Sequence, residues 1–179
     1  MRTIWRVSLV VIVLLVVVLL GAVVRSEPAP LSASGAGAAA ADLQGEWRAK
    51  LQFSSGAFAS IKDLEFMYSF NQGGTMTESS NYDAAPPVPP AYGIWRKVSG
   101  REYEAKYEFY VTKPPANFEE ITKGGGWGLG GRGVFVERIT LSEDGKSFTS
   151  KIKYDQYDTG GKPAEGGGEA TGQGVKLAF

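Results

Sequence analysis

An alternation of apolar and polar residues recurs along most of the chain and constrains its fold more than any other feature. Between Trp47 and Phe53 the larger apolar residues occupy odd positions, while Arg48, Lys50 and Gln52 occupy the even ones. Successive side chains of a β-strand point to opposite faces of the sheet. The alternation therefore predicts an extended strand with one apolar face and one polar face.

Seven further segments have strand character, and turn-forming residues separate several of them. The segments Asn71–Gly74 and Glu143–Lys146, the second with an Asp-Gly pair, predict tight turns. The predicted strands cover residues 46–54, 62–71, 74–82, 92–99, 101–113, 133–142, 147–156 and 168–178. No convincing amphipathic helix separates them. The sequence therefore predicts an all-β antiparallel meander, closed as a barrel or folded as a sandwich.

The first 25 residues are unlike the rest of the chain. Arg2 and Arg6 precede an apolar run over residues 7–24 that is interrupted only by Ser8 and Gly21. A run of about 18 or more apolar residues can span a bilayer, whereas the apolar part of a cleaved signal peptide usually has about 7 to 15. Positive charge ahead of the run predicts a cytoplasmic N-terminus and export of the chain beyond the run. We interpret residues 1–25 as a hydrophobic helix that is either a signal anchor or a cleaved signal peptide.

Residues 26–41 are rich in Ala, Gly, Ser and Pro and show no periodicity, which is typical of a flexible tether. Residues 42–179 then form the predicted β domain. Both interpretations of the N-terminal segment place this domain outside the cytoplasm. It is either anchored to the inner or plasma membrane through residues 7–24, or secreted or periplasmic after cleavage.

Composition excludes several kinds of site. The chain has no cysteine, so disulfides, thiolate metal sites and cysteine nucleophiles are excluded. It also has no histidine, the commonest general base at neutral pH and the commonest transition-metal ligand. Its formal net charge is zero, so no basic field is available to bind a nucleic-acid backbone. We expect no metal site, no cofactor and no nucleic-acid partner, and no residue is predicted to be catalytic.

A Gly-x-Trp motif, Gly45 to Trp47, stands at the start of the first predicted strand. A motif at this place resembles the lipocalins and the wider calycin families, and the resemblance extends over residues 42–179 through strand number and order. It implies an eight-stranded up-and-down barrel in which the glycine permits a tight start and the tryptophan plugs the closed end. It also implies a basic residue from the last strand over the tryptophan. Lys176 stands there in place of the usual arginine, and the second lipocalin motif, a Thr-Asp dipeptide, has no counterpart.

The motif has a second copy, since Gly93–Arg96 repeats the Gly-x-Trp-Arg pattern of Gly45–Arg48. A half-barrel repeat and chance both explain this recurrence. In either case Trp95, like Trp47, is predicted to be buried, because a strand presents such rings to its apolar face. The proline-rich segment Tyr82–Gly93 that precedes and overlaps this copy is predicted to be a stiff loop at one rim of the barrel.

Aromatic residues on the predicted apolar faces provide the candidate binding site. An eight-stranded barrel either fills its interior with side chains or encloses one small ligand. A buried phenol needs a partner for its hydroxyl, and a ligand-filled or wet cavity offers one, as does a packed core with the hydroxyls at its rim. The predicted ligand-binding residues are Phe66, Tyr68, Tyr103, Tyr107, Tyr154 and, near the cavity mouth, Trp127.

The longest predicted connection runs from Pro114 to Arg132 and carries Trp127 among glycines. Loops of this length in compact domains are often lids or binding loops, although plain flexibility also accounts for them. The stretch Gly128–Gly133 spells G-x-G-x-x-G, which in dinucleotide-binding proteins follows a strand and opens a helix. Here the stretch precedes a predicted strand, so we do not expect nucleotide binding.

Three functions remain open on the sequence alone. The first is a non-enzymatic exported barrel that binds a small apolar or amphipathic ligand. The second is an enzyme on the same small barrel, such as an isomerase or cyclase, which a strongly shifted carboxylate in the cavity would favour. The third is an outer-membrane β-barrel with apolar faces toward lipid, suggested by the alternation of Val175, Leu177 and Phe179 at the C-terminus.

Overall fold

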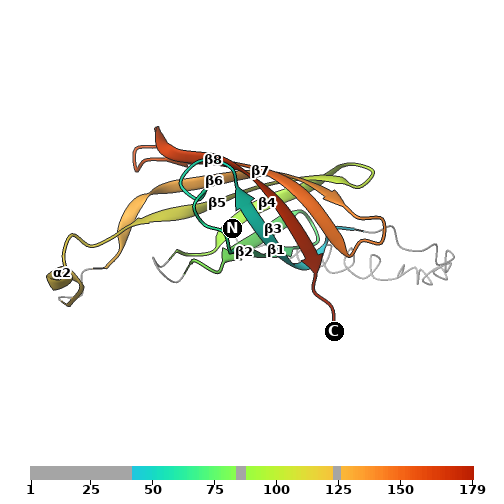
Figure 1. The fold of residues 1–179 in the computed structure, drawn as a ribbon, viewed down its shortest axis with the longest axis horizontal. Helices are drawn as coiled ribbons and strands as arrows, with labels where there is room; N and C mark the ends of the chain where they lie inside the picture. Colours follow the sequence, from blue (N-terminus) through green and yellow to red (C-terminus); the bar gives the residue numbers. More distant parts are fainter. Residues whose placement is uncertain (1–41, 84–87, 123–125) are drawn as a thin grey trace, which may run out of the picture. The chain divides into compact units, whose positions relative to one another are not determined.

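The computed structural model describes residues 42–83, 88–122 and 126–179, which form a closed barrel of antiparallel strands (Figure 1). Each strand pairs with the next along the chain, and the last pairs with the first. The strands are β1 Gly45–Phe53, β2 Leu64–Phe70, β3 Thr75–Ser80, β4 Ala91–Ser99, β5 Glu102–Lys113, β6 Gly128–Leu141, β7 Ser147–Tyr157 and β8 Pro163–Lys176. The predicted all-β, eight-stranded, up-and-down barrel is confirmed.

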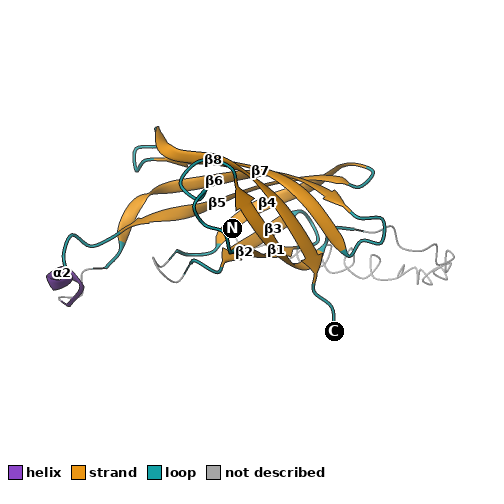
Figure 2. Cartoon of the chain, viewed as in Figure 1, coloured by secondary structure: helices purple, strands orange, loops and turns teal. Residues whose placement is uncertain are grey.

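The connection between β5 and β6 carries one short helix, α2, Phe118–Thr122 (Figure 2). Within the described residues no helix is long and apolar enough to cross a membrane. The predicted N-terminal hydrophobic helix and tether fall on residues 1–41, which lie outside the described part of the chain.

The apolar residues of the alternating pattern face the inside of the barrel, and the polar residues face the outside. In β1, Trp47, Ala49, Leu51 and Phe53 are buried, and the residues between them are exposed. The same parity holds along β2 and β7. Aromatic rings dominate the interior. Burying each large side chain contributes on the order of 1.5–3 kcal/mol, so this inward set supplies most of the driving force for closure.

The start of β6 corrects the prediction of a long loop from Pro114 to Arg132. Strand β6 begins at Gly128, and Leu129 pairs with Thr112 of β5. Residues 128–133 are mostly glycines, which have no side chain and so show no apolar–polar alternation. The sequence pattern therefore could not predict this part of the strand. Gly131 is required here because its φ is +146° and an added Cβ would lie 2.2 Å from the carbonyl oxygen of Tyr157.

The residues of the Gly-x-Trp motif lie at the start of β1 and contact the end of β8. The indole of Trp47 is fully buried and donates a 2.7 Å hydrogen bond to the carbonyl oxygen of Leu43. Lys176 places its Nζ 5.3 Å from the centroid of this indole and donates to the Asp42 carbonyl oxygen at 3.2 Å. Gly45 has a φ of +123°, and an added Cβ would lie 2.9 Å from Lys176 Cε. Gly45, Trp47 and Lys176 therefore meet at one place.

Trp95 differs from its prediction because it is half-buried rather than buried. Its indole nitrogen donates to the carbonyl oxygens of Asn71 and Thr75, at 3.0 and 3.1 Å. Its ring lies 5.9 Å from those of Phe70 and Tyr103, measured between centroids. Trp95 thus packs at the edge of the core, with its indole nitrogen bonded to the β2–β3 turn.

Candidate functional site

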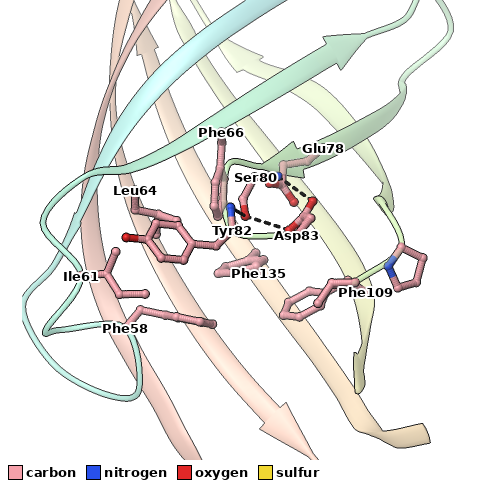
Figure 3. Close-up of a pocket in the computed structure, with 12 residues that line it drawn as sticks. Phe58, Ile61, Leu64, Phe66, Glu78, Ser80, Tyr82, Asp83, Phe109 and Phe135 are labelled. Atoms are coloured by element: carbon pink, nitrogen blue, oxygen red, sulfur yellow. Dashed lines mark hydrogen bonds between the residues drawn. The ribbon is translucent and has the colours of Figure 1, made fainter. Parts of the chain in front are cut away.

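A cavity of about 180 Å³ lies between the connection from β1 to β2 and the connection from β3 to β4 (Figure 3). Strands β2, β3, β5 and β6 form its walls, because their inward side chains reach it. The lining residues are Phe58, Ile61, Leu64, Phe66, Glu78, Ser80, Tyr82, Asp83, Val88, Pro89, Phe109 and Phe135. Eight of these twelve are apolar, and Figure 3 shows the polar groups Glu78, Ser80 and Asp83 gathered on one side.

The apolar wall is held in place by ring stacking. Phe135 stacks on Phe109 with their centroids 5.5 Å apart, and on Tyr154 at 4.9 Å. Phe66 meets the edge of Phe135 at 5.7 Å. Aromatic pairs of this kind add about 0.5–1.5 kcal/mol each beyond their burial. These contacts join the rings of Phe66, Phe109, Phe135 and Tyr154 into one continuous apolar wall.

Glu78 provides the polar side of the cavity from β3. It pairs across the sheet with Tyr68 of β2, and its side chain is only 6% exposed. No donor among the described residues reaches its Oε1 atom. Burial raises the pKa of Glu78 well above its usual value, and the negative charges of Asp83 and Glu137 raise it further.

Asp83 lies beside Glu78 at the start of the connection to β4. Its carboxylate accepts hydrogen bonds from the backbone nitrogen and the hydroxyl of Ser80, both at 2.7 Å. Tyr82, between them in sequence, donates to Asp63 Oδ1 at 2.5 Å. These bonds hold residues 80–83 against the mouth of the cavity. The predicted rim loop Tyr82–Gly93 thus contributes lining residues, although residues 84–87 lie outside the described part of the chain.

A second buried carboxyl group, Glu137 of β6, lies deeper in the barrel. Its Oε2 accepts hydrogen bonds from the hydroxyls of Tyr107, at 2.9 Å, and of Tyr68, at 3.1 Å. Burial raises the pKa of Glu137, and these two hydroxyls oppose the rise. The Ser150 hydroxyl also opposes it, although its geometry falls short of a full hydrogen bond. Burial and the charge of Glu137 raise the pKa of both tyrosines well above the usual value.

The structure disperses the predicted binding residues along the barrel. Only Phe66 lines the cavity. Tyr68 and Tyr107 donate hydrogen bonds to Glu137, whereas the Tyr103 hydroxyl lies 3.3 Å from Oδ1 of Asp42, just before β1. The two remaining predicted residues, Tyr154 and Trp127, differ in their exposure to solvent. Tyr154 is buried behind Phe135, and Trp127, just before β6, is 42% exposed.

Sequence reasoning missed Glu78 and Glu137, although a signal for both was present. Glu137 has the same parity as Phe135, Ile139 and Leu141 in β6, all of which are buried. Glu78 has the parity of buried Met76 in β3. A carboxyl group is rarely buried unless it has a partner or a function. The alternation that places Glu78 and Glu137 on inward faces is therefore enough to single them out as candidate functional residues.

Among the described residues, no cluster of acidic side chains could hold a metal ion. No family model matches the sequence, and no curated protein is found to be similar to it. The closed eight-stranded meander is consistent with a calycin-like barrel.

Proposed function

We propose that the barrel domain, residues 42–179, binds one small apolar or amphipathic ligand in the cavity between Phe66 and Phe109. The observation that carries this proposal is the cavity itself, with stacked phenylalanines on its walls and a few polar groups on one side. Ligand sites of proteins commonly combine an apolar lining with a few placed polar groups.

The volume of the cavity limits the size of the ligand. Pockets for drug-sized molecules occupy roughly 300–1,000 Å³, well above the 180 Å³ found here. An apolar cavity of about 150 Å³ is enough to admit benzene. The proposed ligand therefore has about one ring, or an aliphatic body of similar volume.

The outer surface supports a barrel surrounded by water over the outer-membrane alternative. Charged side chains such as Arg48, Lys50 and Lys106 project from the strands and are exposed. Most aromatic side chains of the strands are buried, although Tyr92 and Tyr110 are exposed. A lipid-facing barrel has the opposite pattern, with an apolar band outside. In this proposal the domain is exported, and residues 7–24 either tether it to the membrane or are removed with a signal peptide.

An enzyme on the same barrel is the second candidate, and Glu78 is the observation that favours it. A carboxyl group whose pKa is raised by burial is better suited to transfer a proton to a bound substrate, as isomerases and cyclases require. The two candidates differ in the fate of the ligand. A binding protein releases it unchanged, whereas an enzyme releases a product and loses turnover in Glu78→Gln.

Benzyl alcohol, a neutral one-ring molecule, is a suitable probe for the proposed function. The full chain in nanodiscs, titrated by calorimetry against empty nanodiscs as a blank, should bind one molecule per chain. Val88→Trp should abolish binding, because Val88 lines the cavity and the larger ring would fill it. Val98→Trp is the matched control, since Val98 is exposed on β4. Equal binding by both variants, or none by the wild type, would contradict the proposal.

A further inference from the structure

The unpartnered carboxyl of Glu78 is the one feature of the cavity that an apolar ligand leaves unexplained. The side chain is almost fully buried, and no donor among the described residues reaches Oε1. Buried polar atoms nearly always have a partner, and a buried oxygen without one is destabilising. A barrel that only needed an apolar pocket would be more stable with a neutral residue at this position.

The groups around Glu78 all favour a positively charged partner. Asp83, on the connection after β3, and Glu137, on β6, both act on it with negative charge. Of the two strands paired with β3, β2 places Tyr68 opposite Glu78 and β4 places Ala91 there. On β5, one strand further, the Tyr107 hydroxyl lies close enough for the charge of Glu78 to raise its pKa. None of the described residues that line the cavity is a lysine or an arginine.

The chemistry of the cavity selects an organic cation over other ligands. A metal ion needs a set of oxygen ligands, and the described residues offer no such cluster. An anion would be repelled by the negative charge of Asp83 and would keep Glu78 from ionising. An ammonium group on a hydrocarbon body suits both parts of the cavity, since its charge can pair with a carboxylate and its body can pack on the rings of Phe66 and Phe109.

We propose that the ligand of this cavity is a small primary amine of about one ring, whose ammonium group pairs with Glu78 while its hydrocarbon body packs between Phe66 and Phe109. This inference rests on the proposed function and deepens it by naming the ligand class.

The pairing couples binding to pH. An ammonium ion binds the ionised form of Glu78, so binding displaces the proton that burial retains in the empty cavity. The affinity for an amine therefore rises with pH as Glu78 ionises, and falls again when the amine itself loses its charge. A neutral ligand shows no such rise, which makes the pH profile a second measure of the pairing.

The test compares benzylamine, benzyl alcohol and benzoate, which share one ring and differ in charge. Calorimetry uses the full chain in nanodiscs, with empty nanodiscs as a blank. We expect benzylamine to bind about tenfold more tightly than benzyl alcohol, and benzoate not to bind, because a charged hydrogen bond replaces a neutral one. Glu78→Gln should remove this tenfold preference and keep benzyl alcohol binding. Glu169→Gln, an exposed carboxylate of β8, should change neither.

Each outcome decides between the two proposals. If none of the three compounds binds, the proposed function fails. If benzyl alcohol binds as tightly as benzylamine at all pH values, the cavity binds ligands but the amine inference is wrong. If Glu78→Gln keeps the preference for benzylamine, Glu78 is not the partner and the inference is also overturned. Should Glu78→Gln not fold, the wild-type pH profile still tests the inference, since benzylamine binding that does not rise with pH while benzyl alcohol binding stays constant would overturn it.

Discussion

The Tyr107 hydroxyl donates a 2.9 Å hydrogen bond to Glu137 Oε2 inside the barrel, where both side chains are fully buried. Tyr107→Phe removes this donor without removing the ring. We expect it to destabilise the domain by about 1–3 kcal/mol, because a buried carboxyl group loses a partner. Urea denaturation measures the change. Tyr110→Phe, at an exposed position of the same strand, should leave the stability unchanged, and equal effects from both variants would contradict the role given to Tyr107.

Removing the indole of Trp47 should be among the most destabilising single changes. The side chain is fully buried, its ring lies 5.1 Å from that of Phe148, and its nitrogen is bonded to Leu43. Trp47→Ala should destabilise the domain by about 3–5 kcal/mol, the usual cost of deleting a large buried aromatic. Thermal or urea unfolding gives the value. Trp127→Ala, at an exposed tryptophan, is the control and should stay within about 0.5 kcal/mol of wild type.

Glu78 should make folding stability depend on pH in a defined direction. Because its folded-state pKa is raised, the unfolded chain loses this proton first, near the ordinary value of 4.5. The stability contributed by the neutral carboxyl is present below about 4.5 and is lost as pH rises through the folded-state pKa. Glu78→Gln stays neutral, so the difference in unfolding free energy, Glu78→Gln minus wild type, should increase as pH rises above about 4.5.

Urea titrations at several pH values measure this difference. Glu169→Gln supplies the control, since it removes a carboxylate that is exposed on the outer face. A difference that does not change with pH would show that Glu78 has the same pKa in the folded and unfolded chain, and one that decreases would show that folding lowers this pKa.

The charged outer face also predicts the behaviour of the isolated domain. Expressed without the first 41 residues, it should be soluble and give a β-type far-UV circular dichroism spectrum, because its apolar set points inward. Recovery only from inclusion bodies, with refolding that requires detergent, would instead favour the outer-membrane alternative.

The alternation of apolar and polar residues was enough to predict the strands in which bulky side chains alternate. It did not predict the glycine-rich parts of strands. β1 and β7 were found within a residue of their bounds because bulky side chains mark both faces. The first residues of β6 and β8 were missed, since Gly131, which pairs with Val111, and Gly166, which lies within β8, have no side chain to alternate. Backbone pairing depends on the neighbouring strand, which a single sequence does not display.

The candidate site was harder to predict than the fold. The alternation placed Phe66, Tyr68 and Tyr107 in the interior. It does not show where along the barrel axis the interior is filled by side chains and where a cavity remains. That depends on the loops, because Phe58 and Pro89 come from connections that alternation does not describe. Glu78 could have been found from its parity with Met76.

A crystal structure of residues 42–179 soaked with 4-bromobenzyl alcohol tests the central claim, that the cavity binds a small ligand, most directly. The bromine gives an anomalous signal that locates the molecule without reference to the rest of the map. We predict one strong peak inside the barrel, between Phe66 and Phe109, with the ring against Phe135. A filled or collapsed cavity with no peak, or peaks only on the outer surface of the barrel, would contradict it.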